Sequence, residues 1–237
     1  MKNGEFLIKN TENLLGLYTS ILLTVLAVVT FAIAVGTPPI SGPFSMGAPI
    51  QYPFLDIISR FPRDYIWMYP AILLTIIFVV FMVCIHHYAA SNKKIFSQIG
   101  LSFAIISATI LIATYFIQIS VIQPSLIAGE TDGISILTQY NPHGLFIALE
   151  EVGYLLMSLA CFCVAPVFSR PAKLEKSIRL TFMAGFVLTI AALIIITGQY
   201  GIYREYRFEV AVITINWMVL IVSGILMSIL FSRARQK

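Results

Sequence analysis

The chain has 237 residues, of which 59% are hydrophobic and 11% are charged, and its mean hydropathy is +0.91. Water-soluble domains carry about 25% charged residues, so the composition excludes that class and indicates an integral membrane protein. The formal net charge of +4 does not indicate a nucleic-acid-binding protein, because the basic residues gather at the ends of the apolar segments.

Six apolar segments are long enough to cross a bilayer as helices. They cover residues 13–36, 66–89, 97–124, 142–168, 178–200 and 208–231. The first segment is longer than a signal-peptide core and is expected to be retained. The sequence therefore predicts one all-α domain over residues 1–237, a bundle of six transmembrane helices. A prokaryotic plasma membrane is the expected location of this multi-pass protein.

Lysine and arginine residues favour one side of the predicted bundle. The N-terminal tail has two, the loop at 93–94 has two, the loop after the fourth segment has four and the C-terminal tail has three. Thus 11 of the 15 basic residues share one side. Basic residues concentrate on the cytoplasmic side of membrane proteins. The pattern therefore predicts that both termini are cytoplasmic.

The longest loop on the outer side, residues 37–65, is rich in proline, glycine and aromatic residues. Its second half is predicted to form a short helix, because Pro53 suits a first helical position and Pro62 ends the helix. Three apolar residues would share one face of it: Leu55, Ile58 and Phe61. We therefore expect this helix to lie at the outer membrane interface.

The fourth segment carries two adjacent glutamates within an apolar run. With Asn141 as N-cap and Pro142 as the first helical residue, Glu150 and Glu151 lie about 12 to 14 Å along the helix. An ionised acid inside a membrane costs on the order of 3 kcal/mol, so such an acid indicates a functional site. Two adjacent carboxyls in a low dielectric do not both ionise readily. The pair therefore suits proton exchange, or binding of a cation that displaces a proton.

Helical spacing places the two glutamates on different faces. His143, Glu150 and Tyr154 would form one row, whereas Glu151 is rotated by about 100° onto a face with small residues. Small residues mark close helix contacts, so Glu151 is expected to pack against a neighbouring helix and accept a hydrogen bond from it. The donors considered are Gln118 and Asn216. Glu150 is expected to face a cavity and titrate.

Other polar residues lie at a matching depth on other segments. Tyr115, Gln118 and Asn216 are about 9 to 14 Å from the outer ends of their helices, as the glutamates are. The candidate ligand- or proton-binding residues are Glu150, Glu151, His143, Tyr154, Gln118, Tyr115 and Asn216. Together they predict a polar pocket in the outer half of the bundle.

This pocket favours a protein that binds or transports a small ligand or ion, surrounded by the lipid bilayer and without a nucleic-acid partner. Two alternatives remain open. A membrane-embedded enzyme acting on a lipid or isoprenoid would use one glutamate as general acid or base, with His143 or Tyr154 as its partner. A structural or accessory subunit would use the glutamates only to specify helix packing.

Known motifs do not account for the glutamates. Tandem glutamates resemble the motif of intramembrane CAAX-type proteases, but that family has an arginine where this chain has Leu155. A bis-histidine haem needs histidines at similar depth, whereas His86 and His87 are inner and His143 is outer. The three cysteines lie in apolar segments, where thiols pack as small apolar groups. No cofactor, metal or disulfide is therefore expected.

Overall fold

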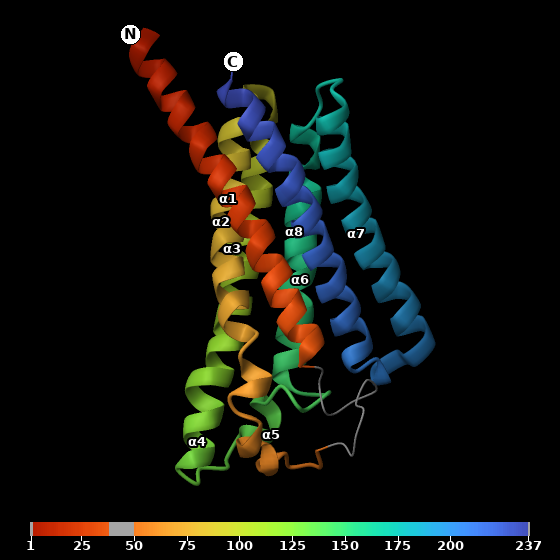
Figure 1. Ribbon diagram of the computed structural model, residues 1–237. Helices are drawn as coiled ribbons and strands as arrows, with labels where there is room; N and C mark the ends of the chain where they lie inside the picture. Colours follow the sequence, from red (N-terminus) through yellow and green to blue (C-terminus); the bar gives the residue numbers. More distant parts are fainter. Residues whose placement is uncertain (1, 38–49, 237) are drawn as a thin grey trace.

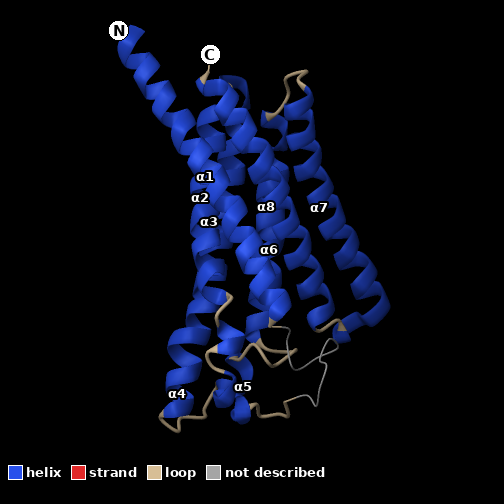
Figure 2. Cartoon of the chain, viewed as in Figure 1, coloured by secondary structure: helices blue, strands red, loops and turns tan. Residues whose placement is uncertain are grey.

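The computed structural model describes residues 2–37 and 50–236, with side chains from residue 10 onward. Over these residues the chain is helical and contains no strand (Figure 2). The long helices are α1 (Lys2–Gly36), α2 (Met68–Tyr88), α3 (Lys94–Ile117), α6 (Leu145–Val164), α7 (Lys173–Tyr200) and α8 (Tyr206–Arg235). Each is long and apolar enough to cross a membrane, which confirms the predicted number of helices and indicates a multi-pass membrane protein.

The six long helices form a closed ring. Each packs against its neighbours in the order α1, α2, α3, α6, α7, α8 and back to α1, and α6 also contacts α8 directly. Helix α7 is the least enclosed, since 17% of its most apolar stretch is buried, compared with 56% for α6. It therefore presents apolar side chains such as Val187 and Ile194 outward, as a lipid-facing helix does.

The two ends of the bundle differ in shape (Figure 1). Both ends of the chain lie at one end, which we call the terminal end. The other end, the loop end, holds the short helices η1 (Leu55–Arg60), η2 (Arg63–Tyr65), α4 (Gln123–Ile127) and α5 (Ile134–Leu137), and the α7–α8 turn. A π-helical turn, η4 (Gln118–Ile122), joins α3 to α4, and this run extends past the other long helices. Such π-turns interrupt regular helices and are frequent near functional sites.

Small residues bring the helices together at several contacts, of which two also involve hydroxyl side chains. On α6, a Cβ added at Gly153 would lie 2.5 Å from a methyl carbon of Leu111 on α3, and the Ser107 hydroxyl donates to the Gly153 carbonyl at 2.7 Å. On α8, a Cβ at Gly224 would lie 2.9 Å from the Ser20 carbonyl oxygen of α1. Close approach through glycine, with hydroxyl side chains across the contact, is typical of membrane helix packing.

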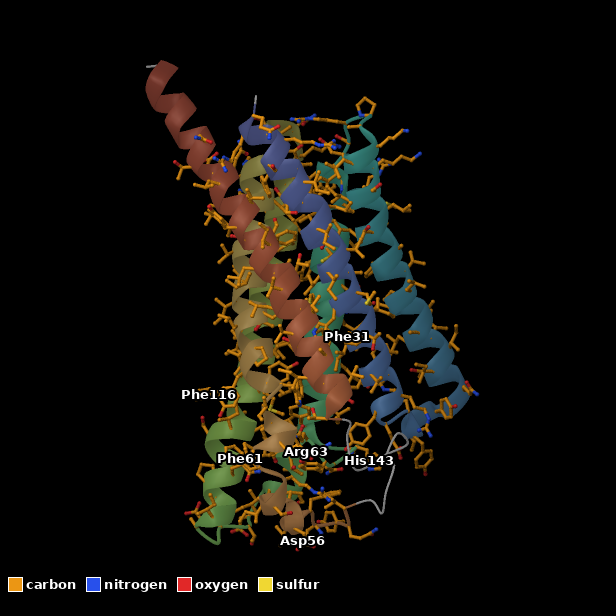
Figure 3. All side chains as sticks on the ribbon, in the orientation of Figure 1. Phe31, Asp56, Phe61, Arg63, Phe116 and His143 are labelled. Carbon is orange, nitrogen blue, oxygen red and sulfur yellow. The ribbon has the colours of Figure 1, made fainter. Side chains whose placement is uncertain are left out.

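The loop after α1 contains a short helix, although residues 38–49 lie outside the described residues. It begins at Leu55, so Pro53 is not its first residue, and its place at a membrane interface stays a prediction. Helix η1 is a 3₁₀ helix, and Ile57 is its buried residue. The three residues predicted to share a face are exposed, with relative exposures of 37% for Leu55, 45% for Ile58 and 43% for Phe61. A 3₁₀ helix has three residues per turn, so Leu55 and Ile58 align, whereas Phe61 is the extended residue that follows the helix. Figure 3 shows Phe61 and Asp56 at the loop end.

The start of α6 differs from the prediction. The helix begins at Leu145, after Gly144, whose φ of −80° and ψ of 167° are extended. Asn141 is not the N-cap: its side-chain oxygen instead accepts the backbone N–H of His143 at 2.9 Å, within a turn. The predicted N-terminus was therefore wrong by three residues, because the polar turn satisfies its own hydrogen bonds before the helix starts. Glu150 then lies only about 8 Å from the helix start, at 1.5 Å per residue.

Candidate functional site

Three buried carboxyls gather toward the loop end, where α6 contacts α8. Glu150 and Glu151 on α6 have relative exposures of 0% and 4%, and Glu209 in the first turn of α8 has 8%. The first two were predicted as candidate residues. Glu209 was missed, because it stands at the beginning of an apolar segment, where acids are usually solvated. The useful signal was its spacing of seven residues from Asn216, which places both on the buried face of α8.

Glu150 lies at the end of a hydrogen-bonded network that crosses three helices. Its Oε1 atom accepts the Tyr115 hydroxyl of α3 at 2.6 Å. The Tyr115 and Tyr154 hydroxyls are 3.0 Å apart, and the indole N–H of Trp217 on α8 donates to Tyr154 at 3.0 Å. Tyr115 thus contacts Glu150 directly, and Tyr154 is linked to Glu150 through Tyr115. Every member is buried, so the network fixes the side-chain orientations.

The second carboxyl oxygen of Glu150 lies outside this hydrogen-bonded network. Its Oε2 atom is buried and makes no hydrogen bond of ordinary geometry within the described chain. The carboxyl of Glu209 is its close neighbour, and the two groups interact directly. Two carboxyls in contact away from water cannot both carry a full charge at low free-energy cost. A pair of this kind can share a proton or bind a cation.

Glu151 forms an ion pair with Arg204, from the turn between α7 and α8. The Glu151 side chain is 5% exposed and that of Arg204 is 35% exposed. The carboxyl is therefore buried, while the guanidinium side of the ion pair is partly exposed to solvent. This corrects the predicted donors. Glu151 does face a neighbouring segment, but its partner is a turn residue that no helical spacing could identify.

Among the described residues, Gln118 and Asn216 form hydrogen bonds with backbone groups and not with the glutamates. The Gln118 amide nitrogen donates to the Leu137 carbonyl at 2.6 Å, and its oxygen accepts the Gln139 N–H at 3.0 Å. Asn216 donates to the Val212 carbonyl of its own helix at 2.8 Å. Neither residue is hydrogen-bonded to a glutamate carboxyl in the described structure. Gln118 instead secures the loop that precedes α6.

His143 also lies apart from the glutamate pair. Its side chain is 60% exposed, and its Nε2 atom is 4.0 Å from a carboxyl oxygen of Glu205. Figure 3 places it at the loop end of the molecule. The predicted row of His143, Glu150 and Tyr154 was therefore wrong at its first member, because the turn before Leu145 takes His143 off the helix.

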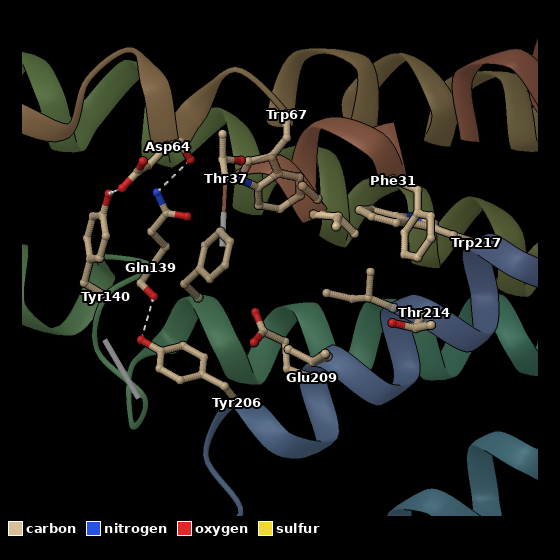
Figure 4. Close-up of a pocket in the computed structure, with 15 residues that line it drawn as sticks. Phe31, Thr37, Asp64, Trp67, Gln139, Tyr140, Tyr206, Glu209, Thr214 and Trp217 are labelled. Atoms are coloured by element: carbon tan, nitrogen blue, oxygen red, sulfur yellow. Dashed lines mark hydrogen bonds between the residues drawn. The ribbon is translucent and has the colours of Figure 1, made fainter. Parts of the chain in front are cut away.

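A cavity of about 340 Å³ opens beside the carboxyl pair. Its lining comes from α1, α2, α8 and the segment before α6: Phe31, Ala34, Val35, Thr37, Asp64, Trp67, Gln139, Tyr140, Phe146, Tyr206, Glu209, Val210, Ile213, Thr214 and Trp217. Figure 4 shows the Glu209 carboxyl pointing from α8 into the space between the aromatic rings. None of the seven candidate residues belongs to the described lining of this cavity; Glu209 does, and Glu150 interacts with Glu209. The prediction that Glu150 itself faces the cavity was wrong.

Hydrogen bonds close the cavity toward the loop end. The Tyr140 hydroxyl donates to Oδ2 of Asp64 at 2.9 Å, and the Tyr206 hydroxyl donates to the Gln139 carbonyl at 3.0 Å (Figure 4). Asp64 also pairs with Arg63 at 2.5 Å. Burial, together with the neighbouring Tyr65 and Asp64, raises the pKa of Tyr140 above its ordinary value. Tyr140 therefore keeps its proton and remains a donor across the usual pH range.

The six apolar helices are compatible with a multi-pass membrane protein, and their bundle holds a cavity beside a buried carboxyl pair. The part of the chain that the structure describes contains no group of three His, Cys, Asp or Glu residues arranged to hold a metal ion. No protein-family model, curated protein or solved structure matches the chain. The function must therefore be argued from the site itself.

Proposed function

We propose that this protein binds or transports a small ligand through the loop-end cavity, and that binding is coupled to proton exchange at the Glu150–Glu209 pair. One observation carries the proposal: a fully buried carboxyl contacts a second carboxyl that points into a cavity of ligand size. Small-ligand pockets have volumes of about 300 to 1,000 Å³ and mostly apolar walls with a few polar groups, which matches this lining.

The proposal includes an orientation. Arg60, Arg63, Arg204 and Arg207 lie on segments at the loop end, whereas the other basic residues that the structure describes belong to segments toward the terminal end. The positive-inside rule then places the terminal end in the cytoplasm and opens the cavity toward the outside. In a background without the three native cysteines, Asp132→Cys should react with a membrane-impermeant maleimide from outside, and Lys176→Cys only from inside. The reverse pattern would invert the orientation.

Intrinsic fluorescence tests the binding function directly, because the chain has two tryptophans and both line the cavity. We expect at least one of three similarly shaped benzyl compounds to change this fluorescence saturably in nanodiscs. The three are benzyltrimethylammonium, neutral neopentylbenzene and anionic benzylsulfonate. If none of them does so, the binding function is wrong.

A matched pair of variants locates the signal. Ala34 lines the cavity and Ala32, two residues earlier on the same helix, is exposed. Ala34→Phe should fill the cavity and remove the fluorescence change, whereas Ala32→Phe should leave it intact. Equal effects of the two variants would place binding elsewhere. If Glu209→Gln abolishes the turnover of a lipid but not ligand binding, the enzyme alternative is favoured.

A further inference from the structure

Resting on the proposed function, we infer that the cavity selects an organic cation, a protonated amine or quaternary ammonium group on an apolar body. The inference comes from the chemistry of the cavity wall. It names the ligand class, which the geometry of the proton-exchanging pair does not by itself specify.

Aromatic rings make up much of the wall. Six lining residues are aromatic: Phe31, Trp67, Tyr140, Phe146, Tyr206 and Trp217. Trp217 organises part of this wall, because its ring lies 5.9 Å from Phe31 at 81° and 6.3 Å from Trp67 at 63°. Rings at these angles turn faces in several directions, and ring faces attract cations. A wall of this kind surrounds an alkylammonium group better than it surrounds a hydrated ion.

The charged side chains in the described lining of the cavity are all acidic. The described lining includes two carboxyls and no lysine, arginine or histidine. Asp64 is already paired with Arg63 and accepts the Tyr140 hydroxyl. Glu209 is nine-tenths buried, points into the cavity and has no basic partner among the described residues. A cationic ligand would supply the missing positive charge, whereas an anion would meet only acids.

Arg204, the partner of Glu151, does not supply that charge. Arg204 is committed to Glu151, and its guanidinium also lies 5.7 Å from the ring centre of Phe208. A bare metal ion is disfavoured, since hard cations need six or more oxygen ligands and this wall is mainly apolar. An organic cation needs one carboxylate and ring faces, which are the groups present.

Protons must compete with such a ligand. The titratable and charged groups that surround Glu209 are Glu150, Glu151 and Tyr154 on α6, Tyr115 on α3, Asp64 and Tyr140 across the cavity, Tyr206 on α8, and Arg204 through Glu151. Lowering the pH adds a proton to the carboxyl pair and removes the charge that attracts the cation. Affinity for the cation should therefore fall as the pH falls.

The three benzyl compounds test the inference, because they differ mainly in charge. At equal free aqueous concentration, benzyltrimethylammonium should bind about tenfold or more tightly than neopentylbenzene, and benzylsulfonate should bind least. Glu209→Gln should remove the preference and its pH dependence, yet leave neopentylbenzene binding within about twofold. Glu209→Asp, which keeps the charge, should retain the preference.

The outcomes separate this inference from the proposed function. If neopentylbenzene or benzylsulfonate binds and benzyltrimethylammonium does not, the cavity is a binding site but the cation class is wrong. If the preference survives in Glu209→Gln, the inference is also wrong. If none of the three compounds binds, the proposed function fails with it. Retained neopentylbenzene binding shows that the Glu209→Gln protein is folded.

Discussion

Buried glutamates occur at both ends of the bundle, but their surroundings differ. At the terminal end, the Glu175 side chain is 5% exposed and is fully matched. It accepts the Tyr88 hydroxyl at 2.6 Å and the Arg170 backbone N–H at 2.9 Å, and the Arg170 side chain lies 3.6 Å away. At the loop end, the three buried glutamates have one arginine partner among the described residues, Arg204, and it pairs with Glu151.

The neighbouring cavities differ in the same way. A cavity of about 440 Å³ at the terminal end is lined by both acids and bases, including Glu12, His87, Arg170, Glu175 and Arg233. Acids are the charged groups in the described lining of the loop-end cavity. Burial of a carboxyl is thus not the mark of a site in this protein, because Glu175 is buried and satisfied. What distinguishes the proposed site is a buried carboxyl that has no basic partner among the described residues.

The largest expected loss of stability comes from breaking the Arg204–Glu151 ion pair at the loop end. Arg204→Gln leaves Glu151 buried without a cation and should lower the free energy of unfolding by about 2 kcal/mol. This value is below that of a fully buried pair, because the Arg204 side chain is 35% exposed and partly screened by solvent. Chemical unfolding in detergent measures it.

A double variant is the control for Arg204→Gln. Adding Glu151→Gln removes the orphaned charge and should restore most of the lost stability. Glu151→Ala alone should cost about 1 to 3 kcal/mol by leaving its partner unpaired. Additive losses in the double variant would mean that the two side chains act independently.

Glu175→Gln tests the terminal end and should lower the free energy of unfolding by about 1 to 2 kcal/mol, since a charge-assisted set of hydrogen bonds is weakened. Thermal unfolding measures the loss. Binding of the benzyl compounds at the loop end should be unchanged in this variant. A change in that binding would show that the two ends are coupled and would break the comparison.

Glu150→Gln and Glu209→Gln should have smaller effects on stability, below about 1 kcal/mol, because an amide can replace a protonated carboxyl in shape and hydrogen bonding. Either variant should nevertheless remove the infrared band of the protonated carboxyl pair, and Glu209→Gln should also remove the pH dependence of cation binding. Glu175→Gln is the matched control and should leave both features intact. If stability falls as far in these variants as in Arg204→Gln, the pair is structural and the accessory-subunit alternative gains support.

His143→Ala should have the smallest effect, below about 0.5 kcal/mol, because exposed pairs such as His143–Glu205 are weak. Benzyl-compound binding and its pH dependence should also persist. A strong loss of function in this variant would mean that His143 reaches the carboxyl pair, as the enzyme alternative requires.

The sequence alone determined the class of fold and the burial of two of the acids. Six helices followed from the lengths of apolar runs, because a bilayer leaves the backbone few ways to satisfy its hydrogen bonds. The burial of Glu150 and Glu151 followed from their place inside one of these runs. The roles proposed for them remain predictions.

Tertiary structure decided which groups meet. Helical periodicity defines the faces of one helix, but it does not say which other helix covers each face. Tyr115, Glu150 and Glu209 come together only because α6 packs against both α3 and α8. Arg204 reaches Glu151 from a turn, where no periodic pattern applies, and His143 leaves the helix face because a turn bonds internally before Leu145. The excess of acids that marks the site is a property of these long-range contacts, so it became visible only in three dimensions.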